Sequence, residues 1–76
     1  MITMTDFAKA IAVFEKYFKE YDLVLKENMA IDKGKLHIDL TPSLISDEDK
    51  EILRKGGFLW EYGRTWSYIE WINATH

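Results

Sequence analysis

His37 and Asp39 are the residues whose types and spacing come closest to acid–base chemistry. They stand two apart in a segment that we expect to be a strand, so both side chains lie on one face, where the carboxylate could orient the imidazole. A nucleophile is missing, because the chain has no cysteine and no serine in a nucleophile pattern. The second histidine, His76, is the last residue. We therefore expect no catalytic residue and no enzyme activity.

A run of four carboxylates could suggest a cation site, since hard cations prefer oxygen ligands. The run consists of Asp47, Glu48, Asp49 and Glu51. Consecutive residues on a helix point in different directions, and the glycine-containing pattern of a calcium loop is absent. We interpret the run as the solvated first turn of a helix, where carboxylates complement the helix dipole. We expect neither a metal nor a cofactor.

Aromatic side chains are concentrated between residues 58 and 71. Exposed aromatic clusters beside an arginine are typical anchors of protein interfaces. In a chain this small the same rings are also needed for the core, so both interpretations stay open. The candidate partner-binding residues of this segment are Trp60, Arg64, Trp66, Tyr68 and Trp71. Asp47 and Glu48 are further candidates, because an acidic surface would raise the rate of association with a basic partner.

The first element that must position these residues is a helix, predicted over residues 4–22. Its large apolar residues recur at spacings of four, three, four and three, which places them on one face. They are Phe7, Ile11, Phe14, Phe18 and Tyr21. Thr3 is the expected N-cap, with Asp6 three residues further on.

Residues 23–40 are predicted to form a β-hairpin around Lys33-Gly34, a two-residue turn in which glycine tolerates a positive φ. The apolar face then pairs Ile31 with Leu36 and Met29 with Ile38. The polar face pairs Asp32 with Lys35, Ala30 with His37 and Asn28 with Asp39. A slip of one residue would mix the two sets, so the turn and the face pattern support the same register.

A second helix is predicted to begin at Ser46 and to end before Gly56-Gly57. Its first turn is acidic and its last turn holds Arg54 and Lys55, the arrangement that the helix dipole favours. Two more strands follow, giving the order α-β-β-α-β-β. We therefore expect residues 1–76 to form a single α+β domain in which antiparallel hairpins pack against two helices. Whether the hairpins form one sheet or two layers stays open.

The last hairpin has two possible registers. A two-residue loop, Gly63-Arg64, would put aromatic residues on both faces. A three-residue loop at 62–64 with a bulge would gather four aromatic residues on one face: Phe58, Trp60, Trp66 and Tyr68. We prefer the second register, because its clean alternation is typical of a half-buried antiparallel pair. In both registers we expect a partly exposed aromatic patch.

Charge and hydropathy restrict the classes of partner. Ten Lys and Arg residues stand against thirteen Asp and Glu residues, for a net charge of −3, which disfavours nonspecific binding to nucleic acid. No apolar run approaches the roughly 18 residues of a membrane span, and no basic region precedes the first apolar residues. We expect a cytoplasmic protein with no membrane segment and no small-molecule substrate.

Two stretches near the C-terminus carry a resemblance. Residues 52–60, ILRKGGFLW, followed by residues 65–68, TWSY, resemble the C-terminal signature of small uncharacterised proteins encoded by bacteriophages and prophages. The resemblance covers residues 46–70, with Gly-Gly where Leu-Gly is more usual. It implies a source in a mobile element, where small acidic domains often act by binding a host protein. It supplies no catalytic residues.

Three functions are consistent with the sequence. The first is a noncatalytic protein-binding module, encoded by a phage and acting as a modulator or inhibitor of a host or defence protein. The second is a self-associating structural protein that buries its aromatic face against a copy of itself. The third is stacking of single-stranded nucleic acid on the aromatic side chains, which the shortage of basic residues disfavours.

Overall fold

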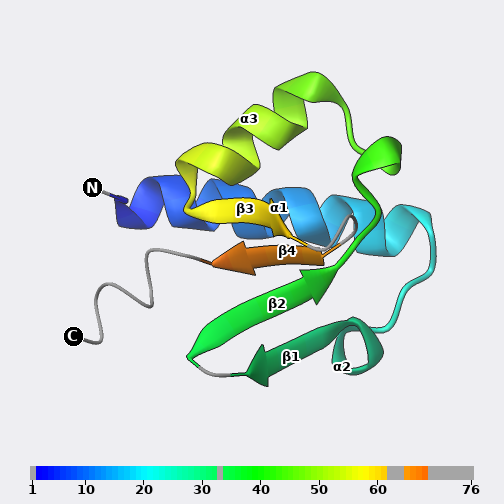
Figure 1. Ribbon diagram of the computed structural model, residues 1–76. Coiled ribbons are helices and arrows are strands. Elements are labelled where there is room, and N and C mark those ends of the chain that lie inside the picture. Colours follow the sequence, from blue (N-terminus) through cyan, green and yellow to red (C-terminus); the bar gives the residue numbers. More distant parts are fainter. Residues whose placement is uncertain (1, 33, 62–64, 69–76) are drawn as a thin grey trace.

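Two helices pack on one face of a four-stranded antiparallel sheet (Figure 1). The computed structural model describes residues 2–32, 34–61 and 65–68. Its helices are α1 (Met4–Glu20), the single turn α2 (Leu25–Asn28), the 3-10 turn η1 (Pro42–Leu44) and α3 (Asp47–Lys55). Its strands are β1 (Met29–Asp32), β2 (Lys35–Asp39), β3 (Phe58–Glu61) and β4 (Thr65–Tyr68). The predicted α+β class and order of the main elements are confirmed, and the two short turns are additions.

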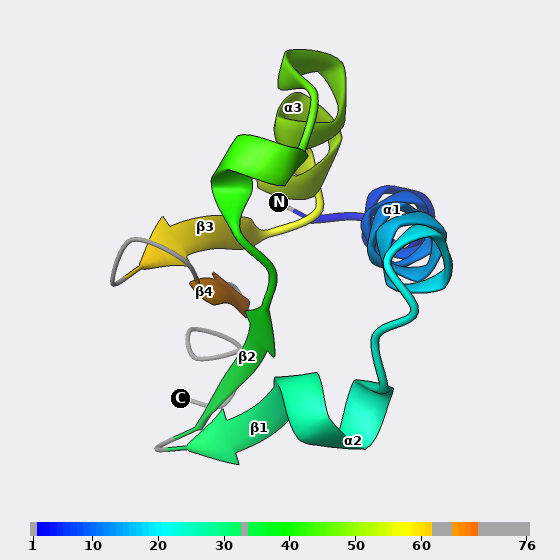
Figure 2. The same cartoon turned by 90° about the vertical axis from the view of Figure 1, so that its right-hand side faces the viewer.

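The two hairpins join into one sheet with the strand order β1-β2-β4-β3. The join is the antiparallel pairing of β2 with β4, which sets Ile38 opposite Trp66 and His37 opposite Ser67. Figure 2 shows the sheet and α1 as two layers, with α3 above β3 and with β1 at the far edge. The inner face of the sheet is the one that α1 and α3 cover. The outer face is the opposite one.

The first hairpin has the predicted register. Met29 pairs with Ile38 and Ile31 with Leu36, all on the inner face, and Gly34 has a φ of 78°. The predicted pair of Asn28 with Asp39 is wrong, because Asn28 ends α2 and the strand begins one residue later. The Asn28 side-chain amide donates to the carbonyl of Val24 at 2.7 Å, which closes this helical turn.

Helix α1 buries a broader surface than the predicted stripe. Thr3 caps it as expected, accepting the Asp6 backbone N–H at 3.0 Å. Phe14 and Phe18 are buried, whereas Ile11 and Tyr21 remain exposed. The side of α1 that faces α3 is buried as well, and it consists of Ala10, Val13 and Tyr17. Part of the stripe stays exposed because α1 packs against both the sheet and α3, so its buried face extends toward α3.

Gly56 lets α1 and α3 approach closely. A Cβ atom at this position would lie 2.5 Å from the Ala10 Cβ and 2.9 Å from the Asp6 carbonyl oxygen, so any side chain would push the helices apart. The next residue, Gly57, has a φ of 95°, which ends α3 and turns the chain into β3. The predicted stop at Gly56-Gly57 is confirmed, and Gly56 has the added role of a packing contact.

A partly buried polar network also joins the two helices. Asp49 Oδ2 accepts hydrogen bonds from Lys16 Nζ and from the Tyr17 hydroxyl, both at 2.6 Å. The Tyr17 oxygen in turn accepts the backbone N–H of Ser46 at 3.1 Å, and Ser46 caps α3. The Lys16 ammonium, followed by the Tyr17 hydroxyl, holds the pKa of the Asp49 carboxyl below its usual range. The interpretation of Asp49 as a solvated carboxylate is therefore wrong.

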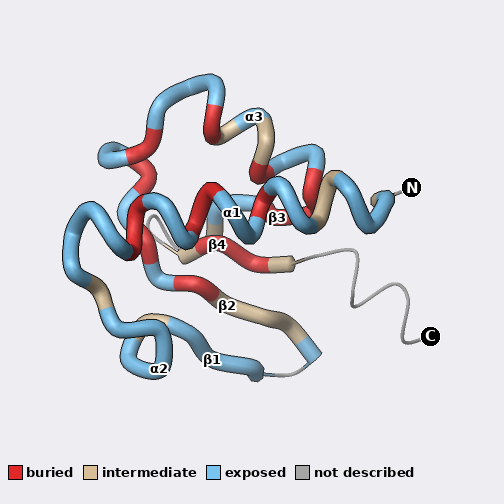
Figure 3. The backbone as a smooth tube through the Cα atoms, turned by 180° about the vertical axis from the view of Figure 1, so that it is seen from behind, coloured by how far each residue is buried: buried red, intermediate tan, exposed pale blue. Residues whose placement is uncertain are grey.

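The core lies between α1, α3 and strands β2 to β4. Figure 3 shows its buried segments on the facing sides of these elements, while β1 and α2 are exposed along most of their length. Phe58 is at its centre, with its ring in edge contact with Phe14 at 5.0 Å between centroids. The buried apolar residues are Ala10, Val13, Phe14, Tyr17, Phe18, Ile38, Leu40, Ile45, Leu53, Phe58 and Trp66.

Replacement of Asp49 by Asn is expected to lower the free energy of unfolding at pH 7 by about 1–3 kcal/mol, since it removes the charge that Lys16 and Tyr17 contact. Urea unfolding measures the difference. Because the folded-state pKa of Asp49 is lowered, its contribution is complete above about pH 4 and is lost as the pH falls further.

The difference between wild type and Asp49→Asn should therefore shrink in acid. Glu15→Gln is the control, because Glu15 forms only an exposed helical pair with Lys19. Equal unfolding free energies of wild type and Asp49→Asn at pH 7 would contradict a role of the network in joining the helices.

Candidate functional site

The described strands of the C-terminal hairpin pair in the preferred register, in which Glu61 lies opposite Thr65. Phe58 pairs with Tyr68 and Trp60 with Trp66, so four aromatic side chains share the inner face. Residues 62–64, which include Arg64, and residues 69–76, which include Trp71, lie outside the described residues. The predicted role of those two residues stays a prediction.

Trp66 belongs to the core. Its side chain is 4% exposed, and its indole Nε1 donates to the Leu40 carbonyl at 3.0 Å. Its prediction as a surface anchor is wrong, because the pairing of β4 with β2 places it centrally in the sheet. Tyr68 is half-buried, and its ring is in edge contact with Phe7 at 5.0 Å between centroids.

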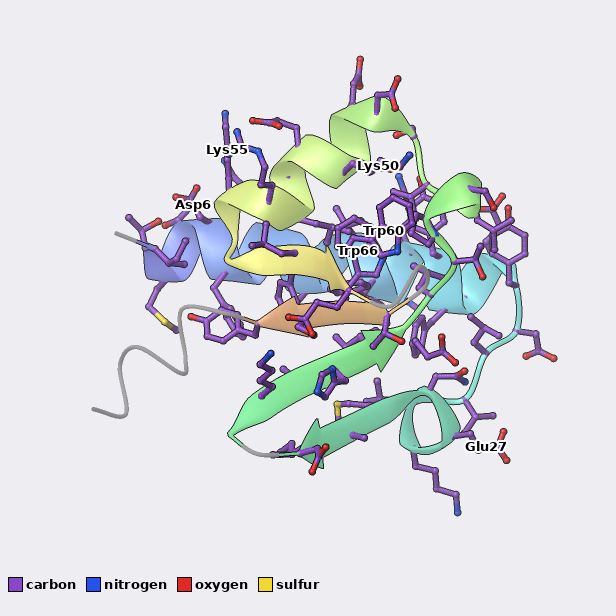
Figure 4. All side chains as sticks on the ribbon, viewed as in Figure 1. Asp6, Glu27, Lys50, Lys55, Trp60 and Trp66 are labelled. Atoms are coloured by element: carbon purple, nitrogen blue, oxygen red, sulfur yellow. The ribbon has the colours of Figure 1, made fainter. Side chains whose placement is uncertain are left out.

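Trp60 is the exposed member of this group, at 56%. It lies on the edge strand β3 beside α3, next to Trp66 (Figure 4). The hollow that it lines there also includes Asp47, Lys50, Arg54, Leu59 and Trp66. Glu48 is exposed in the first turn of α3 but does not line this hollow. Among the predicted anchors, Asp47, Trp60 and Trp66 therefore line one hollow, but Trp66 is buried and only Trp60 adds substantial exposed aromatic surface there.

A larger apolar groove lies on the other side of α1, between this helix and the β1–β2 hairpin. It has a volume of about 570 Å³. Helix α1 forms one wall, the inner face of the hairpin forms the other, and the segment that leads into α2 lies between them. The apolar lining consists of Ile11, Phe14, Phe18, Leu23, Leu25, Met29, Leu36 and Ile38.

The groove exists because α1 is held toward α3 and the β3–β4 hairpin. Phe7 and Phe14 of α1 contact the rings of Phe58, Tyr68 and Trp66 on that side. No described helix longer than the single turn α2 lies over β1. Large apolar side chains at the groove are consequently exposed, at 52% for Leu25 and 39% for Met29. Clusters of this kind typically mark interaction sites.

The charged residues of the groove lie at its rim. Glu15 and Lys19 form an exposed ion pair at 3.5 Å, and Asp22 follows the end of α1. The pair is neutral in sum, so Asp22 leaves the rim with one net negative charge. The sequence analysis did not predict this groove, because periodicity places Ile11 on the apolar stripe of the helix but does not show that it stays exposed.

The outer face of the sheet carries a second polar cluster. Ser67 Oγ and His37 Nδ1 are hydrogen-bonded at 2.9 Å, and Lys35 Nζ lies 3.1 Å from Glu61 Oε1. The Lys35 ammonium holds the pKa of Glu61 below its usual range. Ser67 is fully buried, so its contact with His37 joins β2 to β4 and does not present a hydroxyl to solvent. This contact was not predictable from the sequence, because it depends on the β2–β4 register.

In the described ranges no cluster of three or more His, Cys, Asp or Glu side chains could hold a metal ion. No helix of the described chain combines the length and apolar character that crossing a bilayer needs. No protein-family model matches the sequence, and no curated protein and no solved structure is significantly similar to it.

Substitution of the two tryptophans should separate core from surface. Trp66→Ala is expected to lower the free energy of unfolding by about 3–5 kcal/mol, the usual cost of emptying a buried aromatic site. Trp60→Ala should cost less than about 1 kcal/mol, because most of its ring already contacts solvent. Urea unfolding followed by circular dichroism measures both.

If Trp66→Ala is too unstable to fold, Trp66→Phe provides the comparison, since it keeps an aromatic ring in the core while removing the hydrogen bond to Leu40 and part of the ring volume. A cost below about 0.5 kcal/mol for Trp66→Phe, or an equal cost for the two alanine variants, would show that Trp66 is not a core residue in solution.

Proposed function

We propose that this chain is a noncatalytic protein-binding module, and that the groove between α1 and the β1–β2 hairpin is its contact surface. The observation that supports the proposal is the size and apolar character of the groove, in which Leu25 and Met29 are 52% and 39% exposed. Exposure of the apolar side chains of such a groove to water is unfavourable, so a partner that covers them lowers the free energy.

The polar groups at the groove favour a protein partner over a small molecule. Small-molecule sites usually combine an apolar lining with a few polar groups that converge on the ligand. Here the charged residues stand at the rim, and two of them pair with each other. Such a surface provides apolar contact area and little orientation for a small ligand.

We further propose that the partner is a host or defence protein and that the chain acts as its phage-encoded modulator. The resemblance of residues 46–70 to phage proteins and the net charge of −3 support this choice. An acidic domain is attracted to basic partner surfaces, which raises the association rate. With Trp66 in the core, the aromatic hairpin retains too little described surface to favour the nucleic-acid alternative.

Self-association is the second candidate, and one observation favours it. Strand β1 lies at an edge of the sheet, and all four of its residues are exposed. Edge strands of this kind can pair with a copy of the same strand. Light scattering over a dilution series separates the candidates, since self-association predicts a mass that rises with concentration.

The test of the proposed function compares three proteins in affinity capture from bacterial lysate. They are the wild type, the double variant Leu25→Arg/Met29→Arg and the control Leu59→Arg. Leu59 is 44% exposed on the outer face, so it matches the groove residues in exposure and not in position. We expect the groove variant to reduce recovery of a specific partner at least about tenfold, as loss of interface anchors does.

The control should retain the partner at the wild-type level, with all three proteins folded by circular dichroism. Equal recovery by the groove variant and the wild type would overturn the groove as the contact surface.

A further inference from the structure

We propose that the groove accepts a basic amphipathic helix of the partner, which takes the third place in the helical layer beside α1. The inference rests on the proposed function and specifies the form and charge of the bound segment.

The walls of the groove fit a helix better than a strand. One wall is a helix and the other is the inner face of a sheet, and both contribute apolar side chains: Ile11, Phe14 and Phe18 on α1, and Met29, Leu36 and Ile38 on the hairpin. A helix with its side chains is about 10–12 Å wide, so one helix can contact both walls. A strand added at the edge of β1 would extend the sheet and leave the α1 wall uncovered.

The helical layer is incomplete over β1. Helix α3 lies against α1 and β3, and α1 contacts the aromatic side chains of β3 and β4. The inner-face residues of β1, Met29 and Ile31, have no full helix over them among the described elements. A partner helix alongside α1 would bury them just as α1 buries Phe58 and Trp66. Its apolar residues would recur at i, i+3, i+4 and i+7.

The charges select a basic partner helix. Glu15 and Lys19 neutralise each other at 3.5 Å, which leaves the carboxylate of Asp22 as the net charge of the rim. Asp22 has no ion-pair partner in the described part of the chain. The whole domain carries −3. A second copy would bring the same negative charge to this rim, whereas Lys or Arg residues beside the apolar stripe of a helix would complement it.

The test uses three designed peptides of roughly 18 residues, which form about five helical turns. The first places Leu at i, i+3, i+4 and i+7 with Lys on the opposite face. The second has the same composition in scrambled order, and the third replaces each Lys by Glu. Each is titrated by calorimetry into the full chain and into the Leu25→Arg/Met29→Arg, Leu59→Arg and Asp22→Asn variants.

We expect the basic amphipathic peptide to bind one to one and at least about tenfold more tightly than either other peptide. Leu25→Arg/Met29→Arg should weaken its binding at least about tenfold, and Leu59→Arg should leave it unchanged. Asp22→Asn should weaken it by about twofold to fivefold, because asparagine tolerates the positive φ of 53° at this position and removes only the charge.

Several results would overturn the inference. Equal binding of the scrambled peptide would show that charge alone, and not the amphipathic pattern, causes the binding. Binding that Leu25→Arg/Met29→Arg does not weaken would place the peptide elsewhere. A concentration-dependent dimer that the peptide cannot dissociate would make a second copy the occupant, and contacts of Met29 with residues 69–76 in methyl NMR spectra of the free chain would make its own C-terminal residues the occupant.

The two proposals fail separately. If no helical peptide binds while partner capture still depends on Leu25 and Met29, the groove binds a partner of another form and only the present inference is wrong. If capture is also independent of these residues, the proposed function is wrong as well.

Discussion

Two helices have to cover one face of a four-stranded sheet, and the contact between them decides which part they cover. Gly56 lets α3 approach α1 to within backbone contact, and Asp49 binds Lys16 and Tyr17 across the same interface. With α1 held toward α3, its aromatic residues fall on β3 and β4. The inner face of β1 is left uncovered, so the core and the groove have the same origin.

A carboxylate in the interface of a thin core needs compensation, because burial disfavours its charged form. Asp49 obtains it from an ammonium and a hydroxyl on α1, while Ser46 caps the helix on which it lies. The Lys16 side chain stays half exposed, so only one of the two charges loses much of its water. The network therefore sets the relative position of the helices at a moderate desolvation cost.

The aromatic hairpin and the groove divide the large apolar residues between stability and binding. Phe58 and Trp66 lie in the core, and Trp60 alone of the described hairpin tryptophans remains largely exposed. The apolar residues left for a partner come instead from α1, α2 and β1, which the aromatic content of the C-terminal segment did not indicate. On the outer face, the hydrogen bond between Ser67 and His37 joins β2 to β4.

Local rules determined much of this protein from sequence. Caps at Thr3 and Ser46, the stop at Gly56-Gly57, and the register of the first hairpin depend on neighbouring residues and were predictable for that reason. The pairing of β2 with β4, the burial of Asp49 and the exposure of Ile11 depend on residues that are distant in the sequence. Periodicity shows which face of an element is apolar, but only the packing of elements against one another decides how much of that face is covered. The groove is the part of these apolar faces that packing leaves uncovered, so only the tertiary structure shows where it lies.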